Sequence, residues 1–382
     1  MKTIFDPRYQ VLIRELVQLR EENGETQTSL SSKINKPQSY LGKIESFERR
    51  LDVIELLDIL EALRVAPKLF FQRVGWIPRT DINKAIPIKA SVESCFNGVV
   101  LNLVLNDSIH KVELENIKVD EYLRLEESIS SLFTKLNSAD NTLKNRDAII
   151  LALKLCFEQH PTVNPSDLYH QVVYRLYLRE YYRTTPEQSW VRAGGEAIQL
   201  FCCERYNAIL KPYGIAVLWL SNETLSVKAL NEMGLYGKVG NSKLDLALYG
   251  TLNNQPVLFG GIHVKASLAE RVTDDIPCSE AMMEAGYLSC LFTFDAKSFP
   301  PPKGDLVNRG EFGSPESPSD KRLYIEKHGS FSGCFSYNLK TIPSLKKTES
   351  GRGIFVSKLD DTDSMPLFIL NFWKAFKKLK KA

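Results

Sequence analysis

One apolar strand that ends on a charged residue constrains the fold of this chain most. The segment VLFGGIHVK, residues 257–265, is typical of a buried β-strand, yet it ends on Lys265. Lysine is almost never fully buried without a partner, so a lysine at the end of a core strand predicts carboxylates nearby. The polar stretch that follows, ASLAERVTDD, contains several acidic residues. The sequence therefore predicts a buried sheet with a charged cluster where this strand ends.

The hydrophobic pattern changes along the chain and predicts several domains. A chain of 382 residues is too long for one ordinary core. Helical spacing of apolar residues dominates residues 1–76 and returns over residues 121–187, whereas residues 77–120 alternate as in a small antiparallel sheet. Residues 188–382 mix helical and strand patterns. We therefore expect a multidomain protein whose last region is an α/β domain with a mixed central sheet.

Composition is typical of a soluble globular protein. Charged residues make up 25% of the chain and apolar residues 43%, and no apolar run reaches the roughly 18 residues that a membrane span needs. Seven cysteines occur without CxxC pairs, which argues against a disulfide framework and a zinc site. We expect a cytoplasmic protein that does not associate with membranes. The lysine-rich end, WKAFKKLKKA, is either a solvated tail or a phosphate contact.

Residues 9–72 contain short helical segments in a recognisable order. TQTSLSSKI and QSYLGKIESFERR flank the turn NKP. Two helices joined by such a turn form the helix-turn-helix, which presents a row of side chains to the DNA major groove. The segment resembles the lambda-repressor and Cro-like family, which implies a DNA-binding domain over residues 1–76. The residues that this resemblance assigns to DNA are Gln27 and Lys43 for the backbone and Gln38, Ser39 and Tyr40 for base edges.

A helical packing module without a DNA role is the alternative for this region. Glu45 and Glu48 lie beside the expected reading face, where their charges would repel phosphates. Gln38 favours the DNA-binding interpretation, because glutamine can form paired hydrogen bonds with adenine.

Asp245 is the first candidate partner for Lys265. It stands in the strand pattern KLDLALYG, and the loop TLNNQ then leads into the strand that carries Lys265. Two strands joined by a short loop are expected to lie side by side, which brings both side chains to one point. A carboxylate there can hold a divalent metal, and an ammonium beside it can orient a water or stabilise charge on a phosphate. A structural ion pair of Asp245 with Lys243 or Lys265 is the alternative.

The order of these residues resembles the PD-(D/E)xK nucleases, most of all type II restriction endonucleases. The resemblance makes Asp245 the first acid and Lys265 the lysine of the motif, but His263 stands where most members have an acid. The branch that cuts CCGG-containing sites supplies the missing carboxylate from the helix after the lysine. Glu280 fits that place, with Glu284 as a substitute, and Glu196 on an earlier helix is expected to bind or tune the metal.

Each of these side chains also has a structural interpretation. Glu196 could be a solvated helix residue, and Glu280 is favoured at a helix start by the helix dipole. His263 is expected to form hydrogen bonds around the site rather than to bind metal.

A recognition segment follows the lysine in the same branch. The resemblance assigns DNA recognition to Glu270, Arg271, Asp274 and Asp275, although their spacing departs from the Arg-x-(Asp/Glu)-Arg pattern of the branch. Arginine can contact O6 and N7 of guanine together, so Arg271 is the leading candidate; an ion pair with Glu270 or Asp274 is the alternative. Arg309, in the loop GDLVNRGEFG, is a further candidate DNA contact.

The resemblance implies a Mg²⁺-dependent, site-specific endonuclease for double-stranded DNA that acts as a homodimer. In this interpretation Asp245, Glu280 and Glu196 hold the metal and Lys265 assists the reaction. The helix-turn-helix either adds a DNA contact or regulates the enzyme's own gene. Two other interpretations stay open, namely a transcriptional regulator with a non-catalytic C-terminal domain and a nuclease of repair or RNA processing.

Overall fold

The computed structural model describes residues 6–74, 90–105, 108–138, 140–239, 244–268, 272–296 and 308–381. Contacts between Cα atoms divide the chain into two units. The first comprises Met1–Lys84 with Tyr182–Thr185, and the second comprises Ala85–Tyr181 with Pro186–Ala382. The finer division into four regions stays a prediction. None of the described helices is both long and apolar enough to cross a membrane.

The first unit is a small helical domain. Its helices are α1 (Pro7–Glu22), α2 (Gln27–Lys33), α3 (Gln38–Glu45), α4 (Val53–Ala62) and α5 (Pro67–Arg73). Side-chain caps start two of them, because Thr26 accepts a hydrogen bond from the backbone N–H of Ser29 and Asp52 from that of Glu55. Apolar side chains from all five helices form one core. The helix order therefore agrees with the helical pattern of the sequence.

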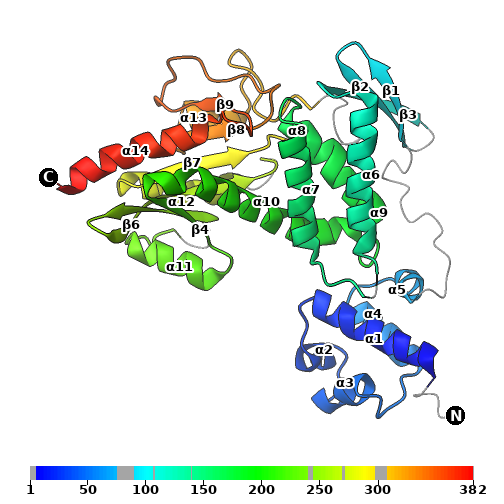
Figure 1. Ribbon diagram of the computed structural model, residues 1–382. Helices are drawn as coiled ribbons and strands as arrows, with labels where there is room; N and C mark the ends of the chain where they lie inside the picture. The colour runs from blue at the N-terminus through cyan, green and yellow to red at the C-terminus, as the bar shows by residue number, and fades with distance from the viewer. Residues whose placement is uncertain are drawn as a thin grey trace. The chain divides into compact units, whose positions relative to one another are not determined.

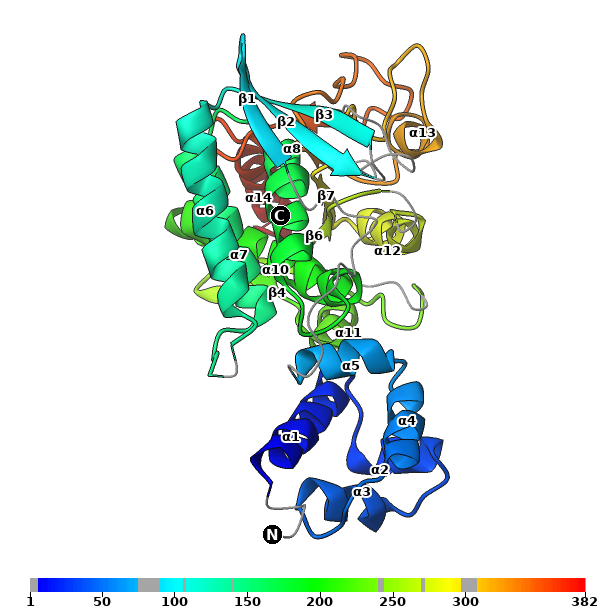
Figure 2. The same cartoon turned by 90° about the vertical axis from the view of Figure 1, so that its right-hand side faces the viewer.

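The second unit begins with a three-stranded antiparallel sheet, β1 (Ala90–Cys95), β2 (Gly98–Leu105) and β3 (Ser108–Glu115). Alternate residues of β2, namely Val99, Leu101 and Leu103, are buried, and α6 (Val119–Lys135) lies beside the sheet (Figure 2). The chain continues through α7 (Asn145–Gln159), α8 (Pro165–Asp167), a π-helix over Leu168–Tyr174 and α9 (Arg175–Glu180). The alternating pattern of this region thus forms a sheet with one buried face.

A six-stranded mixed sheet forms the centre of the second unit (Figure 1). Its strands, in spatial order, are β4 (Ile215–Trp219), β5 (Leu246–Leu252), β6 (Gln255–Lys265), β7 (Leu288–Thr293), β8 (Gly333–Ser336) and β9 (Ile354–Val356). The pairs β4–β5 and β5–β6 are antiparallel and the other pairs are parallel. The helices around it are α10 (Pro186–Leu210), α11 (Glu223–Glu232), α12 (Val272–Glu284), α13 (Asp320–Glu326) and α14 (Ser364–Lys381), with a 3-10 turn over Lys211–Tyr213.

Successive residues of the sheet enter different hydrophobic clusters, so both faces are covered. In β5, Leu246 and Leu248 join the cluster of α10 and α14, whereas Ala247 joins that of α11 and α12. Gly250 lets α14 approach closely, because a Cβ there would lie 2.3 Å from Cζ2 of Trp373. A strand covered on both faces reads as a nearly continuous apolar run, as the sequence around Lys265 does.

The topology brings several strand ends to one edge of this sheet. Because β6, β7 and β8 are parallel, their carboxyl ends, at Lys265, Thr293 and Ser336, lie at the same edge. Strand β5 runs the other way and pairs Leu246 with Ile262 of β6. The residue before β5, Asp245, therefore reaches the edge where β6 ends.

Candidate active site

The expected approach of Asp245 and Lys265 is present in the structure. Lys265 Nζ lies 3.7 Å from Asp245 Oδ2. Two neighbours orient the carboxylate: Gln199 of α10 donates its amide N–H to Oδ1 at 2.7 Å, and the backbone N–H of Val264 donates to Oδ2 at 2.8 Å. Asp245 is buried. Its carboxylate is thus held at the ends of two strands by contacts from β6 and from one helix, α10.

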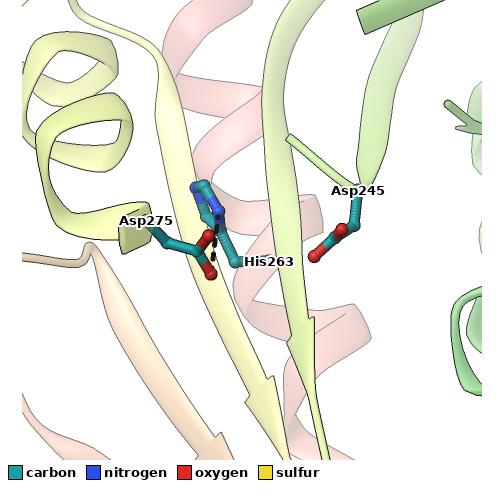
Figure 3. A group of neighbouring side chains, drawn as sticks. All are labelled: Asp245, His263 and Asp275. Atoms are coloured by element: carbon teal, nitrogen blue, oxygen red, sulfur yellow. Dashed lines mark ion pairs between the residues drawn. The ribbon is translucent and has the colours of Figure 1, made fainter. Parts of the chain in front are cut away.

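A second carboxylate, that of Asp275, completes the cluster. Asp275 lies in the first turns of α12 and is buried, and its Oδ2 lies 2.8 Å from Lys265 Nζ and 3.7 Å from His263 Nδ1. Ligand atoms of Asp245, His263 and Asp275 all lie within 4.8 Å of one another. Figure 3 shows the two aspartates pointing toward the same region, with the His263 ring beside Asp275. Lys265 therefore lies within ion-pair distance of two carboxylates.

Burial and charge act against each other in this cluster. Burial raises the pKa of Asp245 and of Asp275, and the Lys265 ammonium partly offsets this increase. Burial alone would lower the pKa of Lys265, but the two carboxylates outweigh it and raise that pKa above its ordinary value. Burial lowers the pKa of His263 to about 4, so its ring is neutral at neutral pH. Lys265 thus remains an ammonium in the cluster.

The donor set fits a hard divalent cation. Two carboxylates supply the oxygen ligands that Mg²⁺ prefers, and a neutral imidazole adjoins them. Both ring nitrogens of His263 and Asp275 Oδ2 are buried without a hydrogen bond to a described residue; Lys265 meets Asp275 Oδ2 at ion-pair distance without hydrogen-bond alignment. Buried polar atoms in native proteins rarely lack partners, and an ion is one recognised explanation. The residues present are therefore compatible with a metal site.

Two glutamates expected at the metal lie outside this cluster. Glu280 is exposed on α12, where Ser330 Oγ donates a hydrogen bond to its Oε1 at 2.8 Å. Glu196 on α10 forms ion pairs with Arg146 at 3.7 Å and with Arg192 at 3.5 Å. Among the described residues, neither belongs to the group of ligand atoms around Asp245.

The early start of α12 explains why Asp275 stands where Glu280 was expected. The resemblance placed the second carboxylate at Glu280, near the start of the helix after the lysine, but α12 starts earlier, at Val272, and includes Pro277. Asp275 consequently faces β6, and Glu280 lies on the exposed side of the same helix. Asp275, which the resemblance assigned to DNA recognition, is a member of the carboxylate cluster.

The other expected recognition residues fall in different surroundings. Glu270 and Arg271 lie outside the described residues. Asp274 is exposed on α12, and Arg309 is exposed on the loop before α13.

The residues expected to contact DNA in the first unit also divide into two groups. Gln38, Ser39 and Lys43 are exposed on α3. Tyr40 is 9% exposed and packs into the domain core under the Arg49 guanidinium, whose carbon lies 4.4 Å from the ring centre. Its burial does not agree with the base-facing role that the resemblance gave it. Gln27 donates its amide N–H to Glu45 at 2.7 Å and is thus held by the protein.

Gln199 is the residue of the site that the sequence did not reveal. It bridges two elements, because its amide N–H binds Asp245 and its amide oxygen accepts a hydrogen bond from the Trp219 indole at 3.0 Å. Its position one helical turn after Glu196, on the helix expected to contribute to the site, was the only signal in the sequence.

Comparison with known proteins identifies the class. Residues 223–361 match the BsaWI restriction endonuclease type 2 family, and residues 16–70 match the helix-turn-helix family. Together with the carboxylate–lysine cluster at the edge of a mixed sheet, these matches define a restriction endonuclease with a helix-turn-helix domain.

A curated relative confirms this assignment. The type II restriction enzyme AgeI of Thalassovita gelatinovora is 48% identical over 258 residues, which cover 66% of this chain and 91% of AgeI. The crystal structure of a specific complex of AgeI with DNA matches with a TM-score of 0.66 and 44% identity, covering 72% of this chain and 99% of that chain. The chain belongs to the type II restriction endonucleases, and the expected fold class is confirmed.

Proposed function

We propose that this protein hydrolyses phosphodiester bonds of double-stranded DNA at a specific sequence, with Mg²⁺ as cofactor. The observation that supports this most is the buried contact of Lys265 with the carboxylates of Asp245 and Asp275 at one sheet edge. The membership in the type II restriction endonucleases favours an enzyme over the alternative of a regulator with a non-catalytic domain.

Asp245 and Asp275 would hold the metal, with His263 as a neighbour. When bound, Mg²⁺ polarises a phosphoryl oxygen and lowers the pKa of a coordinated water. The chain orients its ligands in advance, because Gln199 and the Val264 N–H fix both oxygens of Asp245 before any ion arrives.

Lys265 has the properties of a charge stabiliser rather than of a base. Its raised pKa keeps it protonated at neutral pH, so it has no lone pair with which to take a proton from water. An ammonium at this position can donate hydrogen bonds to a non-bridging phosphate oxygen, where negative charge increases in the transition state. Its place between two carboxylates also fixes the direction of the side chain.

The substrate proposal is supported by the solved relative, which is described as a specific AgeI–DNA complex. We propose double-stranded DNA with a CCGG-containing site, in line with the branch that the sequence resembles. A homodimer is proposed as well, since a two-fold assembly places one catalytic cluster on each strand of a palindrome. A cytoplasmic location follows from the same proposal, because the substrate is intracellular DNA.

The helix-turn-helix domain would supply a second DNA contact. Gln38, Ser39 and Lys43 share the exposed side of α3, with side chains that can bind base edges and phosphates. Two uses agree with this surface, an additional contact during cleavage and binding to the enzyme's own promoter.

Plasmid digestion tests the proposal. The wild type with Mg²⁺ should give discrete fragments, and chelation of the metal should leave the plasmid intact. The D245N variant keeps the shape of the side chain but removes its charge, so it should neither cut nor bind Mg²⁺ in calorimetry. Intact plasmid with the wild type on many DNA substrates would contradict the proposal, and unspecific nicking would indicate a nuclease of repair or RNA processing.

A further inference from the structure

An exposed arginine lies between buried neighbours in the segment from Asn308 to Glu311. Asn308 is 6% exposed, Gly310 is buried, and the Glu311 side chain is 5% exposed, whereas Arg309 is exposed. Loop residues are usually mobile, so tight anchoring on both sides of one charged residue requires a physical reason. The contacts of Asn308, Gly310 and Glu311 show how this anchoring is achieved.

Asn308 is anchored to the helical region and to the end of β8. Its amide N–H donates to Ser166 Oγ at 2.6 Å and to Asp167 Oδ1 at 3.3 Å. Its backbone oxygen accepts a hydrogen bond at 3.1 Å from the amide of Asn338, which follows β8. These bonds are buried, so they fix the backbone just before Arg309.

Glu311 is anchored to the segment that leaves Lys265. Its Oε1 accepts hydrogen bonds from Ser267 Oγ at 2.6 Å and from the backbone N–H of Leu268 at 2.8 Å. Its other carboxylate oxygen pairs with Lys321. The backbone immediately after Arg309 is therefore tied to a strand end that carries the candidate catalytic lysine.

Gly310 and Asp295 complete the set of anchors around Arg309, and together with Asn308 and Glu311 they are called the frame. Gly310 has a φ of +74°, and a Cβ there would lie 1.9 Å from Asp295 Oδ2, so only glycine fits. Asp295 Oδ1 accepts the backbone N–H of Glu311 at 2.6 Å. Asp295 follows β7, so contacts at the ends of β6, β7 and β8 together hold the segment.

Arg309 itself makes no hydrogen bond or ion pair with any residue in the described part of the chain. The anchored neighbours fix the backbone of Arg309 beside the catalytic edge, so a contact made by its side chain costs rotamer freedom but little backbone freedom, which favours a directional contact. Arginine forms two hydrogen bonds with O6 and N7 of guanine, the commonest specific contact in the major groove. A phosphate contact, by contrast, needs only charge and works equally well from a mobile side chain.

We propose that Arg309 reads a guanine base edge in the recognition site and is thereby a specificity-determining residue of the cleavage reaction. This inference rests on the proposed function, because it places the DNA at the edge where Asp245 and Lys265 meet. The frame also predicts that the positions of Arg309 and Lys265 depend on each other, since Glu311 follows Arg309 and binds the backbone after Lys265.

The test compares R309A and R309K with the control R124A in single-turnover cleavage. Arg124 is exposed on α6, where it pairs with Asp120 of its own helix, so its loss removes charge without touching the frame. Substrates carry 7-deazaguanine at one guanine of the cleaved site at a time, which removes N7. We expect R309A and R309K each to lose about 10-fold or more in kcat/KM on the unmodified site. One 7-deazaguanine position should slow the wild type and leave R309A unaffected.

Two results would overturn the inference. Wild-type rates for R309A would show that the arginine does not contribute. Recovery in R309K, with equal losses on all sequences and a smaller salt dependence of binding, would identify a phosphate contact instead. If the wild type cuts no DNA at all, the proposed function fails and this inference fails with it. If the wild type cuts DNA and R309A cuts at the same rate, the proposed function stands and only this inference fails. Matching melting temperatures would confirm that the exposed substitutions leave the fold intact.

Discussion

At the scale of single residues, Lys265 explains the polar residues that follow an otherwise apolar strand. Its ammonium lies 2.8 Å from Asp275 and 3.7 Å from Asp245, and each of these carboxylates is buried. Removal of one member of a buried charge cluster leaves its partners without compensation, which costs about 3–5 kcal/mol in other proteins. The cluster is therefore both a functional candidate and a structural requirement.

Gln199 allows the two roles to be separated. It orients Asp245 through one amide hydrogen bond but carries no charge, so Q199A should retain the fold. We expect the apparent Mg²⁺ affinity in cleavage to fall by about 10- to 100-fold, as for other residues that orient metal ligands. Single-turnover rates over a Mg²⁺ titration measure this effect. An unchanged Mg²⁺ dependence in Q199A would mean that Asp245 does not depend on this bond.

Asp295 gives a prediction for stability as a function of pH. Burial raises its pKa to about 7, against hydrogen bonds from Thr341 and the Glu311 N–H, and the Glu311 carboxylate adds to the increase while Lys321 opposes it. Because the folded pKa lies above the unfolded one, the neutral acid stabilises the fold at low pH, and this contribution is lost as pH rises from about 4 to about 7.

The D295N variant removes this titration. Relative to D295N, the wild type should lose up to roughly 4 kcal/mol of unfolding free energy between these pH values and stay constant above them. Urea unfolding of both proteins at several pH values measures the difference. A difference that is the same at all pH values would show that Asp295 does not titrate in this range.

At the scale of elements, the close approach of α14 to the sheet depends on Gly250. A methyl group there would overlap the Trp373 ring, so G250A should destabilise the second unit by about 1–3 kcal/mol. G195A is the matched control, because a Cβ at this exposed position of α10 meets nothing within 4 Å and alanine favours helix. Thermal unfolding should rank G195A at or above the wild type and G250A below it. Equal stability of both variants would contradict the packing described for α14.

The sequence predicted the elements whose patterns are local. Helical spacing indicated the helices of the first unit, and the short loop TLNNQ predicted that β5 and β6 pair, which brings Asp245 to Lys265. Patterns that depend on tertiary contacts were less informative. The resemblance placed the second carboxylate at Glu280, whereas the contact of Asp275 with Lys265 depends on where α12 starts and how it packs on β6. The burial of Tyr40 likewise depends on packing against Arg49. Gln199 carries a neutral side chain, for which no charge pattern gives a signal.

At the scale of the whole molecule, the additional DNA contact of the first unit and the chemistry of the second unit should be separable. The exposed residues of α3 belong to the first unit, and the carboxylate–lysine cluster belongs to the second. We expect the double variant Q38A/K43A to weaken DNA binding by about 10-fold while the single-turnover rate at saturating enzyme stays unchanged. Gel-shift titration and rapid-quench cleavage measure the two quantities. A lower chemical rate with unchanged affinity would contradict this separation.

One comparison on α12 tests most directly which acidic side chain joins Asp245 in the reaction. D275N and E280Q each remove one carboxylate from the same helix while keeping its shape, but only Asp275 contacts Lys265. Single-turnover cleavage of the cognate site with saturating Mg²⁺ should fall at least about 1000-fold in D275N, comparable to the loss of several kcal/mol of transition-state stabilisation. E280Q should cut at the wild-type rate. Full activity in D275N together with loss of activity in E280Q would contradict the account.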